Sequence, residues 1–361
     1  MTRPADPEPG ERHGGNRIAI ARRLGCRPAQ LLDASASLGP FGPPPGLRLR
    51  LAFGPGLRDY PDRQHLALRQ AIARHHGLEP EQVLPGNGAA ELFTWVARDA
   101  AGVGPSLLPS PGFADYRRAL ACWGASWRPL PLALHWPAAC PQPFPEPGAG
   151  DGAVVWITNP HNPTGQLWSR RSLLPLLERF ALVIADEAFL PLVPAGEQQS
   201  LIPLLDQHPN LVVIRSLTKL HAIAGLRLGY ALARPERLRR WAAWRDPWPL
   251  NGLAAAAGEQ LIADRRWCRR VQHWLAREGP WRQQRLATLP GLTPLPSAAN
   301  FLLLRGATSL EPLRQALERR HRILVRDCRS FEGLDDHWLR LAVLDRPGNR
   351  RLLRALRLET S

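Results

Sequence analysis

Short apolar runs alternate with longer amphipathic stretches along the first two thirds of the chain. Short runs of β-branched and other apolar residues predict buried strands, whereas apolar residues spaced three or four apart predict helices. Strands are expected at 153–158, 182–185, 211–215 and 227–231. Helices are expected at 61–76, 89–100, 113–123 and 169–180. Strands that alternate with helices are typical of βα units, so the pattern predicts an α/β fold with a mainly parallel sheet.

The pattern changes after Trp248. An Arg-rich helical region at 253–289 is longer than a usual single helix, and we expect it to contain a break. Further strands are expected at 301–304, 323–325 and 338–343. These strands predict a second, smaller α/β unit in the last third of the chain.

Three parts follow from these patterns. We expect an N-terminal arm at 1–44 that joins the small domain, a large domain at 45–245 and a small C-terminal domain at 246–361. The segment 128–152 is rich in Pro, Ala and Gly and lacks periodicity, so we expect a surface excursion that carries no chemistry.

The net charge of +16 comes from 47 basic and 31 acidic residues. Such a charge is often found in nucleic-acid-binding proteins, which concentrate it in one stripe or tail. Here a single basic residue is lysine, and the other 46 are arginines spread along the whole chain. This distribution indicates a compositional bias, and we expect no nucleic-acid partner.

The apolar stretches end well before membrane-spanning length, and the first twelve residues are polar and proline-rich. We therefore expect no membrane span, no signal peptide and a cytoplasmic location. The cysteines are far apart, without a C-x-x-C pair or histidines at zinc-ligand spacing, so neither a disulfide framework nor a metal site is expected. They are Cys26, Cys122, Cys140, Cys268 and Cys328.

The only lysine, Lys219, follows an expected strand, and Arg227 follows it eight residues later. Schiff-base chemistry needs a lysine amine, and residues at strand ends of α/β sheets point into the ligand crevice. A lysine kept by chance in a chain that otherwise uses arginine is the alternative, and its position at a strand end argues against it.

Three other segments add polar groups at expected element ends. Asp186 directly follows the strand expected at 182–185. A buried carboxylate there is costly unless it is paired, which favours a cationic partner such as a pyridinium nitrogen. Asn162 lies in the turn 159–165, where its amide can face a ligand oxygen. Gly88 and Ala89 open a helix whose free N–H groups suit a phosphate. Each feature alone is compatible with an ordinary turn or cap, and their common spacing makes the set specific.

Together these segments resemble fold-type I enzymes that depend on pyridoxal phosphate (PLP), the class I and II aminotransferase superfamily, over about 16–349. The resemblance implies a large domain whose mainly parallel sheet lies between helices, plus a smaller α/β domain. It also implies that Lys219 binds the cofactor covalently and moves a proton, while Asp186 pairs with the ring nitrogen. Asn162 would bond the ring hydroxyl, and Phe113 would stack on the ring.

The same resemblance implies a phosphate cradle made of Gly88, Ala89, Ser216 and Arg227. Tyr60 matches a tyrosine that reaches the phosphate of a neighbouring subunit, so a homodimer with shared active sites is expected. One departure is Phe189, because many aminotransferases of this group carry a tyrosine there that bonds the ring oxygen.

Further stretches at 13–16, 217–227, 325–334 and 338–343 resemble the threonine-phosphate decarboxylases of cobalamin biosynthesis, which are close to the histidinol-phosphate aminotransferases. This resemblance implies that Arg340 clamps the carboxylate of a small phosphorylated amino acid, as a bidentate guanidinium suits that group. Arg326 and His13 would face its phosphate. In a chain so rich in arginine either guanidinium could instead be ordinary surface charge.

The resemblance implies decarboxylation of L-threonine O-3-phosphate to (R)-1-aminopropan-2-ol O-2-phosphate. The alternative is an aminotransferase acting on histidinol phosphate or a related amino acid, because both activities use the same cofactor contacts. A noncatalytic basic binding protein is disfavoured by the complete lysine and ligand set. Ser37 stands where the family usually has an asparagine near the substrate, so we expect either an altered substrate preference or weaker binding.

Overall fold

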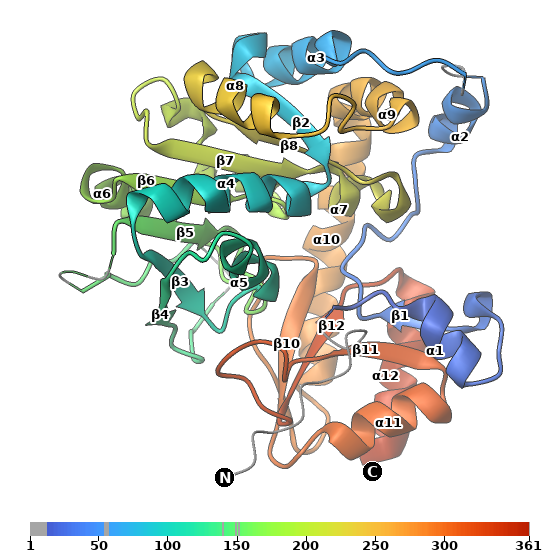
Figure 1. The fold of residues 1–361 in the computed structure, drawn as a ribbon. Coiled ribbons are helices and arrows are strands. Elements are labelled where there is room, and N and C mark those ends of the chain that lie inside the picture. The colour runs from blue at the N-terminus through green and yellow to red at the C-terminus, as the bar shows by residue number, and fades with distance from the viewer. Residues whose placement is uncertain (1–12, 54–57, 139–140, 149, 151, 361) are drawn as a thin grey trace.

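The computed structural model describes residues 13–360 except 54–57, 139–140, 149 and 151. Two sheets with their helices make up the structure, a seven-stranded one and a five-stranded one, and the long helix α10 (Arg265–Leu286) runs from one towards the other (Figure 1). The first twelve residues, on which the expected lack of a signal peptide depends, lie outside the described residues, as does Cys140. The four described cysteines are free thiols.

The large sheet has the strand order β2-β8-β7-β6-β5-β3-β4. Strands β5 to β7 and β3 and β4 pair in parallel, whereas β8 is antiparallel to both of its neighbours. The predicted α/β class and the four predicted strands of this sheet are confirmed, with ends that differ by one residue or less. The strands are β2 (Val83–Asn87), β3 (Ser106–Ser110), β4 (Trp127–Pro131), β5 (Val154–Thr158), β6 (Leu182–Asp186), β7 (Leu211–Ser216) and β8 (Leu228–Leu232).

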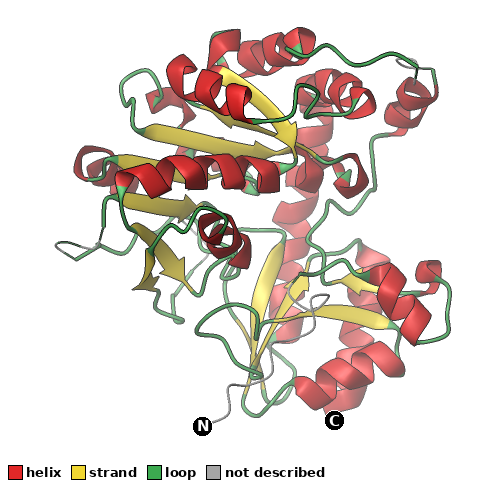
Figure 2. Cartoon of the chain, viewed as in Figure 1, coloured by secondary structure: helices red, strands yellow, loops and turns green. Residues whose placement is uncertain are grey.

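Helices cover both faces of this sheet (Figure 2). Because side chains alternate along a strand, Val155, Val183 and Val213 pack on one face, and their chain neighbours pack on the other. Each such fully buried side chain contributes roughly 1.5–3 kcal/mol. Helices α3 (Leu66–His76), α6 (Arg170–Arg179) and α9 (Gly252–Ala263) cover the first face, and α4 (Ala89–Val103), α5 (Ala114–Ala121) and α8 (Pro235–Trp244) cover the second.

The small sheet has the order β1-β11-β12-β10-β9, with α10, α11 and α12 on one face and α1 packed against Leu324 on the other. The N-terminal strand β1 pairs in parallel with β11, so the start of the chain is built into this sheet. The elements are α1 (Arg17–Arg23), β1 (Leu32–Ala34), β9 (Leu292–Pro294), β10 (Phe301–Gly306), α11 (Glu311–Arg319), β11 (Ile323–Asp327), β12 (Trp338–Ala342) and α12 (Arg346–Thr360).

The prediction of a surface excursion at 128–152 is wrong at its start. Strand β4 pairs in parallel with β3 and forms the edge of the large sheet. Its prolines, Pro129 and Pro131, cannot donate to a ladder and are tolerated on an edge strand, which is why the pattern concealed it. The predicted break in the Arg-rich region is confirmed, because α9 ends before Asp264 and the carboxylate of Asp264 accepts the Trp267 N–H at 2.9 Å as a helix cap.

Helix α9 follows the boundary that the sequence predicts at 245/246, and it packs against the large sheet. Ala254, Ala257 and Leu261 join the apolar core beneath the large sheet, together with Leu47 of α2 (Pro45–Ala52). The predicted domain boundaries at 44/45 and 245/246 both stay predictions. No helix in the described part of the chain is long and apolar enough to cross a membrane.

Candidate active site

The polar residues singled out by the sequence come together at the carboxyl ends of the parallel strands of the large sheet. Parallel strands end on the same side, so Ser110, Asp186 and Ser216 all reach this side, and Gly88 follows β2 there. Strand β8 runs the opposite way, which brings Arg227, just before its start, to the same place. Such strand ends are where α/β sheets bind ligands.

A cavity of about 210 Å³ lies at these strand ends and is bordered on its other side by the small sheet and the N-terminal segment. Eleven of the thirteen residues expected at the site line it: His13, Ser37, Ala89, Phe113, Asn162, Asp186, Ser216, Lys219, Arg227, Arg326 and Arg340. Gly88 adjoins the cavity, and Tyr60 is not among its walls.

Lys219 sits on α7 (Leu217–His221), a one-turn helix that begins directly after β7. The Ser216 hydroxyl accepts the Thr218 N–H at 3.3 Å and caps this turn. Burial, the Arg340 charge and the Arg227 charge lower the pKa of Lys219 to about 8, against the opposing effect of Asp186. The amine lies 5.5 Å from the centre of the Phe189 ring. At pH 7 about a tenth of this amine is therefore neutral and nucleophilic.

Asp186 is buried and held by two donors. The Tyr116 hydroxyl donates to Oδ2 at 2.5 Å, and the Ala188 N–H donates to Oδ1 at 2.9 Å. Burial raises the pKa of Asp186 to about 6, while these donors and Lys219 oppose the increase. The sequence analysis missed Tyr116, although its position on α5, three residues after Phe113 at the start of that helix, was a usable signal.

A cradle for an anion lies at the start of α4. Gly88 precedes the helix with a φ of +74°, and a Cβ atom there would come within 2.5 Å of the Arg227 guanidinium. No side chain caps the first turn, which leaves its N–H groups and the positive end of the helix dipole toward the cavity. With the Ser216 hydroxyl beside them, these groups suit a phosphate dianion.

Two arginines face Lys219 from the small sheet. Arg326 on β11 and Arg340 on β12 are register partners, so residues far apart in sequence lie side by side. Arg340 donates to Asn162 Oδ1 at 2.5 Å and to the Ser35 carbonyl at 3.3 Å, and its guanidinium lies 4.8 Å from the centre of the Phe301 ring. Burial and the charge of Arg326 lower the pKa of Arg340 to about 9.

The N-terminal segment completes this wall. Gly14 lies so close to the Ser35 carbonyl that a Cβ would be 2.3 Å from it, and the Gly15 N–H donates to Ser35 Oγ at 3.0 Å. His13 is thereby placed edge-on to the Phe113 ring, with 5.9 Å between ring centres, and desolvation lowers its pKa. Ser37 is buried, and its hydroxyl has no hydrogen-bond partner among the described residues.

Tyr60 lies apart from the cavity of its own chain. Its side chain is 77% exposed and stacks on Trp248 with 4.2 Å between ring centres. The Arg63 guanidinium lies 4.3 Å from the centre of the same indole ring. Tyr60 is therefore an outward-facing ring with a fixed orientation.

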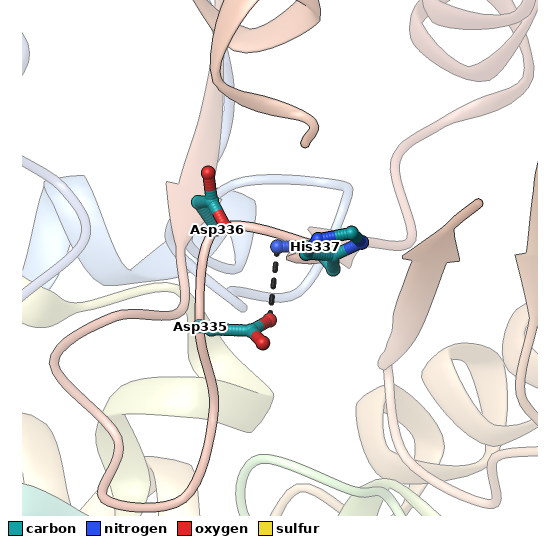
Figure 3. Close-up of side chains that lie close together, drawn as sticks. All are labelled: Asp335, Asp336 and His337. Carbon is teal, nitrogen blue, oxygen red and sulfur yellow. Dashed lines mark hydrogen bonds between the residues drawn. The ribbon is translucent and has the colours of Figure 1, made fainter. Parts of the chain in front are cut away.

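One cluster of possible metal-binding groups occurs in the described residues, at Asp335, Asp336 and His337 (Figure 3). It lies in the turn before β12, where the Asp335 carboxylate accepts the backbone N–H of His337 at 3.0 Å. The exposed Asp335 carboxylate shapes the turn, and nothing else in the described chain indicates an ion.

The aminotransferase class I and II family model matches residues 47–356. Threonine-phosphate decarboxylase of Salmonella typhimurium is 38% identical over 96% of this chain and 95% of its own length. Histidinol-phosphate aminotransferase of Symbiobacterium thermophilum is 33% identical over 94% of this chain and 92% of its own. The crystal structure of a histidinol-phosphate aminotransferase from Clostridium acetobutylicum matches with a TM-score of 0.82 at 25% identity, covering 91% of this chain and 99% of that one. The matches extend over both sheets, and the chain therefore belongs to the aminotransferase class I and II family.

Proposed function

We propose that this protein is a PLP-dependent lyase that decarboxylates L-threonine O-3-phosphate to (R)-1-aminopropan-2-ol O-2-phosphate, a step of cobalamin biosynthesis. The 38% identity with a threonine-phosphate decarboxylase over nearly the whole of both chains supports this choice. A cytoplasmic location and the three-part division of the chain belong to the same proposal.

The residues present fit PLP. Lys219 supplies the amine for covalent attachment, and Asp186 supplies a carboxylate for the ring nitrogen. Phe113 and Ala188 offer apolar surface to the ring, while the Asn162 amide suits the ring hydroxyl. A side chain at Gly88 would run into the Arg227 guanidinium, so the space there is left for a ligand. Gly88, Ala89, Ser216 and Arg227 would hold the phosphate. When bound, the cofactor accepts the electron pair that departing CO2 leaves behind.

The observation that carries the proposal is the buried guanidinium of Arg340. A buried cation is costly unless it is paired, and in the described part of the chain no carboxylate forms an ion pair with Arg340. The bonds that it does make leave it facing the cavity opposite Lys219. A substrate carboxylate would supply the missing charge, and Arg326 and His13 beside it would bind the phosphate.

The chain's own groups account for the remaining chemistry. The bond between Cα and the carboxylate carbon breaks, CO2 leaves, and a proton takes its place at Cα. Lys219 is the group that would donate this proton, because a pKa of about 8 lets the amine hold or release one near neutral pH. Arg340 and Arg326 would orient the substrate, and that orientation decides which bond at Cα breaks.

The runner-up is an aminotransferase for histidinol phosphate or a related amino acid. The 33% identity with a histidinol-phosphate aminotransferase favours it, since the cofactor residues serve either activity. The direct test incubates the PLP-loaded protein with L-threonine O-3-phosphate, without a keto acid, and measures CO2. A parallel reaction holds histidinol phosphate and 2-oxoglutarate and is assayed for glutamate. Catalytic CO2 release supports the lyase, whereas glutamate formation without CO2 release in the first reaction assigns the protein to the aminotransferases.

We also propose a homodimer in which Tyr60 reaches the phosphate of the partner's site. Its exposed ring, held by Trp248, suits that role. Sedimentation of the wild-type protein tests the dimer. Mixing Lys219→Ala with Tyr60→Ala tests the sharing, because mixed dimers hold one intact site and should regain up to about a quarter of wild-type activity. Activity that stays at the level of the separate variants would refute shared sites.

A further inference from the structure

Tyr116 lies directly behind Asp186, outside the cavity. It is 2% exposed, and its hydroxyl contacts two buried groups, Asp186 Oδ2 at 2.5 Å and Thr158 Oγ1 at 2.8 Å. A tyrosine hydroxyl has one hydrogen to donate. Because the carboxylate can only accept when ionised, Tyr116 donates to Asp186 and takes its own bond from the Thr158 hydroxyl. The three side chains form a directed chain that ends on the carboxylate.

Aromatic rings fix the position of this tyrosine. The ring centre of Tyr116 lies 5.0 Å from that of Phe93, 4.9 Å from that of Trp156 and 5.5 Å from that of Phe113. The contacts with Phe93 and Phe113 are edge-on and the contact with Trp156 is tilted, and such packing on several sides holds an aromatic side chain in one orientation. The hydroxyl therefore stays aimed at Asp186, and the same packing connects it to Phe113, which lines the cavity.

Other charged groups near Asp186 cannot replace this bond. Lys219 faces it from α7 and favours the ionised carboxylate, but its amine is the group expected to bind the cofactor. Glu187 is adjacent and disfavours ionisation, although it is paired with Arg215 at 2.7 Å. Asp115 precedes Tyr116 on α5 and forms an ion pair with Arg118. The Ala188 N–H occupies only the other oxygen, Oδ1.

We propose that Tyr116, supported by Thr158, is a positioning residue that keeps Asp186 ionised and oriented toward the ring nitrogen of the cofactor. The inference rests on the proposed function for the identity of that cofactor. Tyr116 would act without touching substrate or cofactor. Its hydroxyl would lower the pH at which Asp186 takes up a proton and PLP affinity falls.

The test measures the dissociation constant of PLP between pH 5 and 9 for the wild type, Tyr116→Phe and Tyr230→Phe. Tyr230 is a matched control because it is equally buried and its hydroxyl bonds a neutral partner, His76 Nε2, at 2.8 Å. Affinity should fall below the pH at which Asp186 takes up a proton. In Tyr116→Phe this fall should lie about one pH unit higher, because a hydrogen bond to the charged form has been lost. The titrating groups of PLP itself affect all three proteins equally, so they cancel when the pH profiles are compared.

A second variant, Thr158→Val, keeps the donor to Asp186 and removes the support behind it, so its shift should have the same sign and be smaller. The inference is overturned if Tyr116→Phe and Tyr230→Phe have the same profile as the wild type, or, should Tyr116→Phe not fold, if Thr158→Val shows no shift. A wild-type protein that does not bind PLP at all would instead refute the proposed function.

Discussion

The two walls of the cavity are built on different principles. The wall of the large sheet consists of strand ends, so a short stretch of backbone places each group, as β6 places Asp186 and β7 places Ser216. The opposite wall combines an N-terminal segment with two strands of the small sheet. There, Arg326 and Arg340 meet only through the register of β11 and β12.

The walls also differ in how their charges are satisfied. Asp186 has a hydroxyl and an N–H on its two oxygens, whereas the bonds of Arg340 go to an amide oxygen and a carbonyl. A neutral acceptor compensates a buried cation less than a carboxylate does. The first wall is thus organised in advance for one resident cofactor. On the second wall, Arg340 has no carboxylate partner among the described residues and can pair with an anion that arrives and leaves. Variants on the two walls should therefore fail in different ways.

Lys219→Ala should have the largest effect. We expect loss of covalent cofactor attachment, checked by mass spectrometry after borohydride reduction, and a rate at least about 10³–10⁴-fold lower. No other lysine in the chain can take over. Covalent attachment that persists in this variant would refute the assignment of the large-sheet wall.

Arg340→Gln should lower kcat/KM by about 10²–10³-fold, because a buried guanidinium that pairs with an anion is worth roughly 3–4 kcal/mol. Arg340→Lys should lose less, since it keeps the charge and loses the planar fork. Both variants should bind PLP nearly as well as the wild type, as measured by equilibrium dialysis. Arg305→Gln, an exposed change on neighbouring β10, is the control. If the Arg340 variants lost PLP affinity as strongly as kcat/KM, the two walls would not serve cofactor and substrate separately.

The raised pKa of Asp186, about 6 against a usual 3.8, should make the cofactor-free protein lose stability as pH rises. The folded state holds this proton more tightly than the unfolded state, so the contribution is complete below about pH 4 and lost by about pH 6. The loss corresponds to about 2–3 kcal/mol. Denaturant unfolding of wild type and Asp186→Asn at several pH values measures it as their difference. A difference that stays constant with pH would contradict the prediction.

The wall formed by the large sheet was also easier to predict from the sequence than the wall formed by the small sheet. The continuous apolar runs of β5, β6 and β7 identified buried strands whose next residues had to meet at one sheet edge, so Asp186, Asn162 and Lys219 were predictable together. Strands β2, β3 and β4 were missed because prolines and glycines, such as Pro85 and Gly86, interrupt their apolar pattern.

Pairing between distant segments was not visible in the sequence at all. The adjacency of Arg326 and Arg340 depends on strand register, and the contact of Tyr116 with Asp186 depends on how α5 packs over β6. The small-sheet wall could therefore be expected only through resemblance, residue by residue. Likewise, the packing of α9 against the large sheet reflects tertiary contacts that the change of pattern after Trp248 did not indicate.

The smallest effect is expected at Ser37, on the substrate-facing wall. Its buried hydroxyl has no partner among the described residues, so Ser37→Ala should leave the free energy of unfolding unchanged or raise it by up to about 1 kcal/mol. Ser35→Ala is the matched control. That hydroxyl donates to Asp33 at 2.6 Å and accepts from the Gly15 N–H at 3.0 Å, so its removal should cost about 1–3 kcal/mol.

Kinetics then show whether the unpaired hydroxyl of Ser37 serves the substrate. If the substrate provides its missing partner, Ser37→Ala should raise KM by about 2- to 10-fold with little change in kcat, because one neutral hydrogen bond is lost. Ser37→Asn, which restores the amide usual in the family, should also act on KM. A Ser37→Ala variant as destabilised as Ser35→Ala would show that the hydroxyl is already paired within the protein. In that case Arg340, whose buried Nε has no hydrogen-bond partner among the described residues, would be the remaining group of this wall for the substrate to pair with.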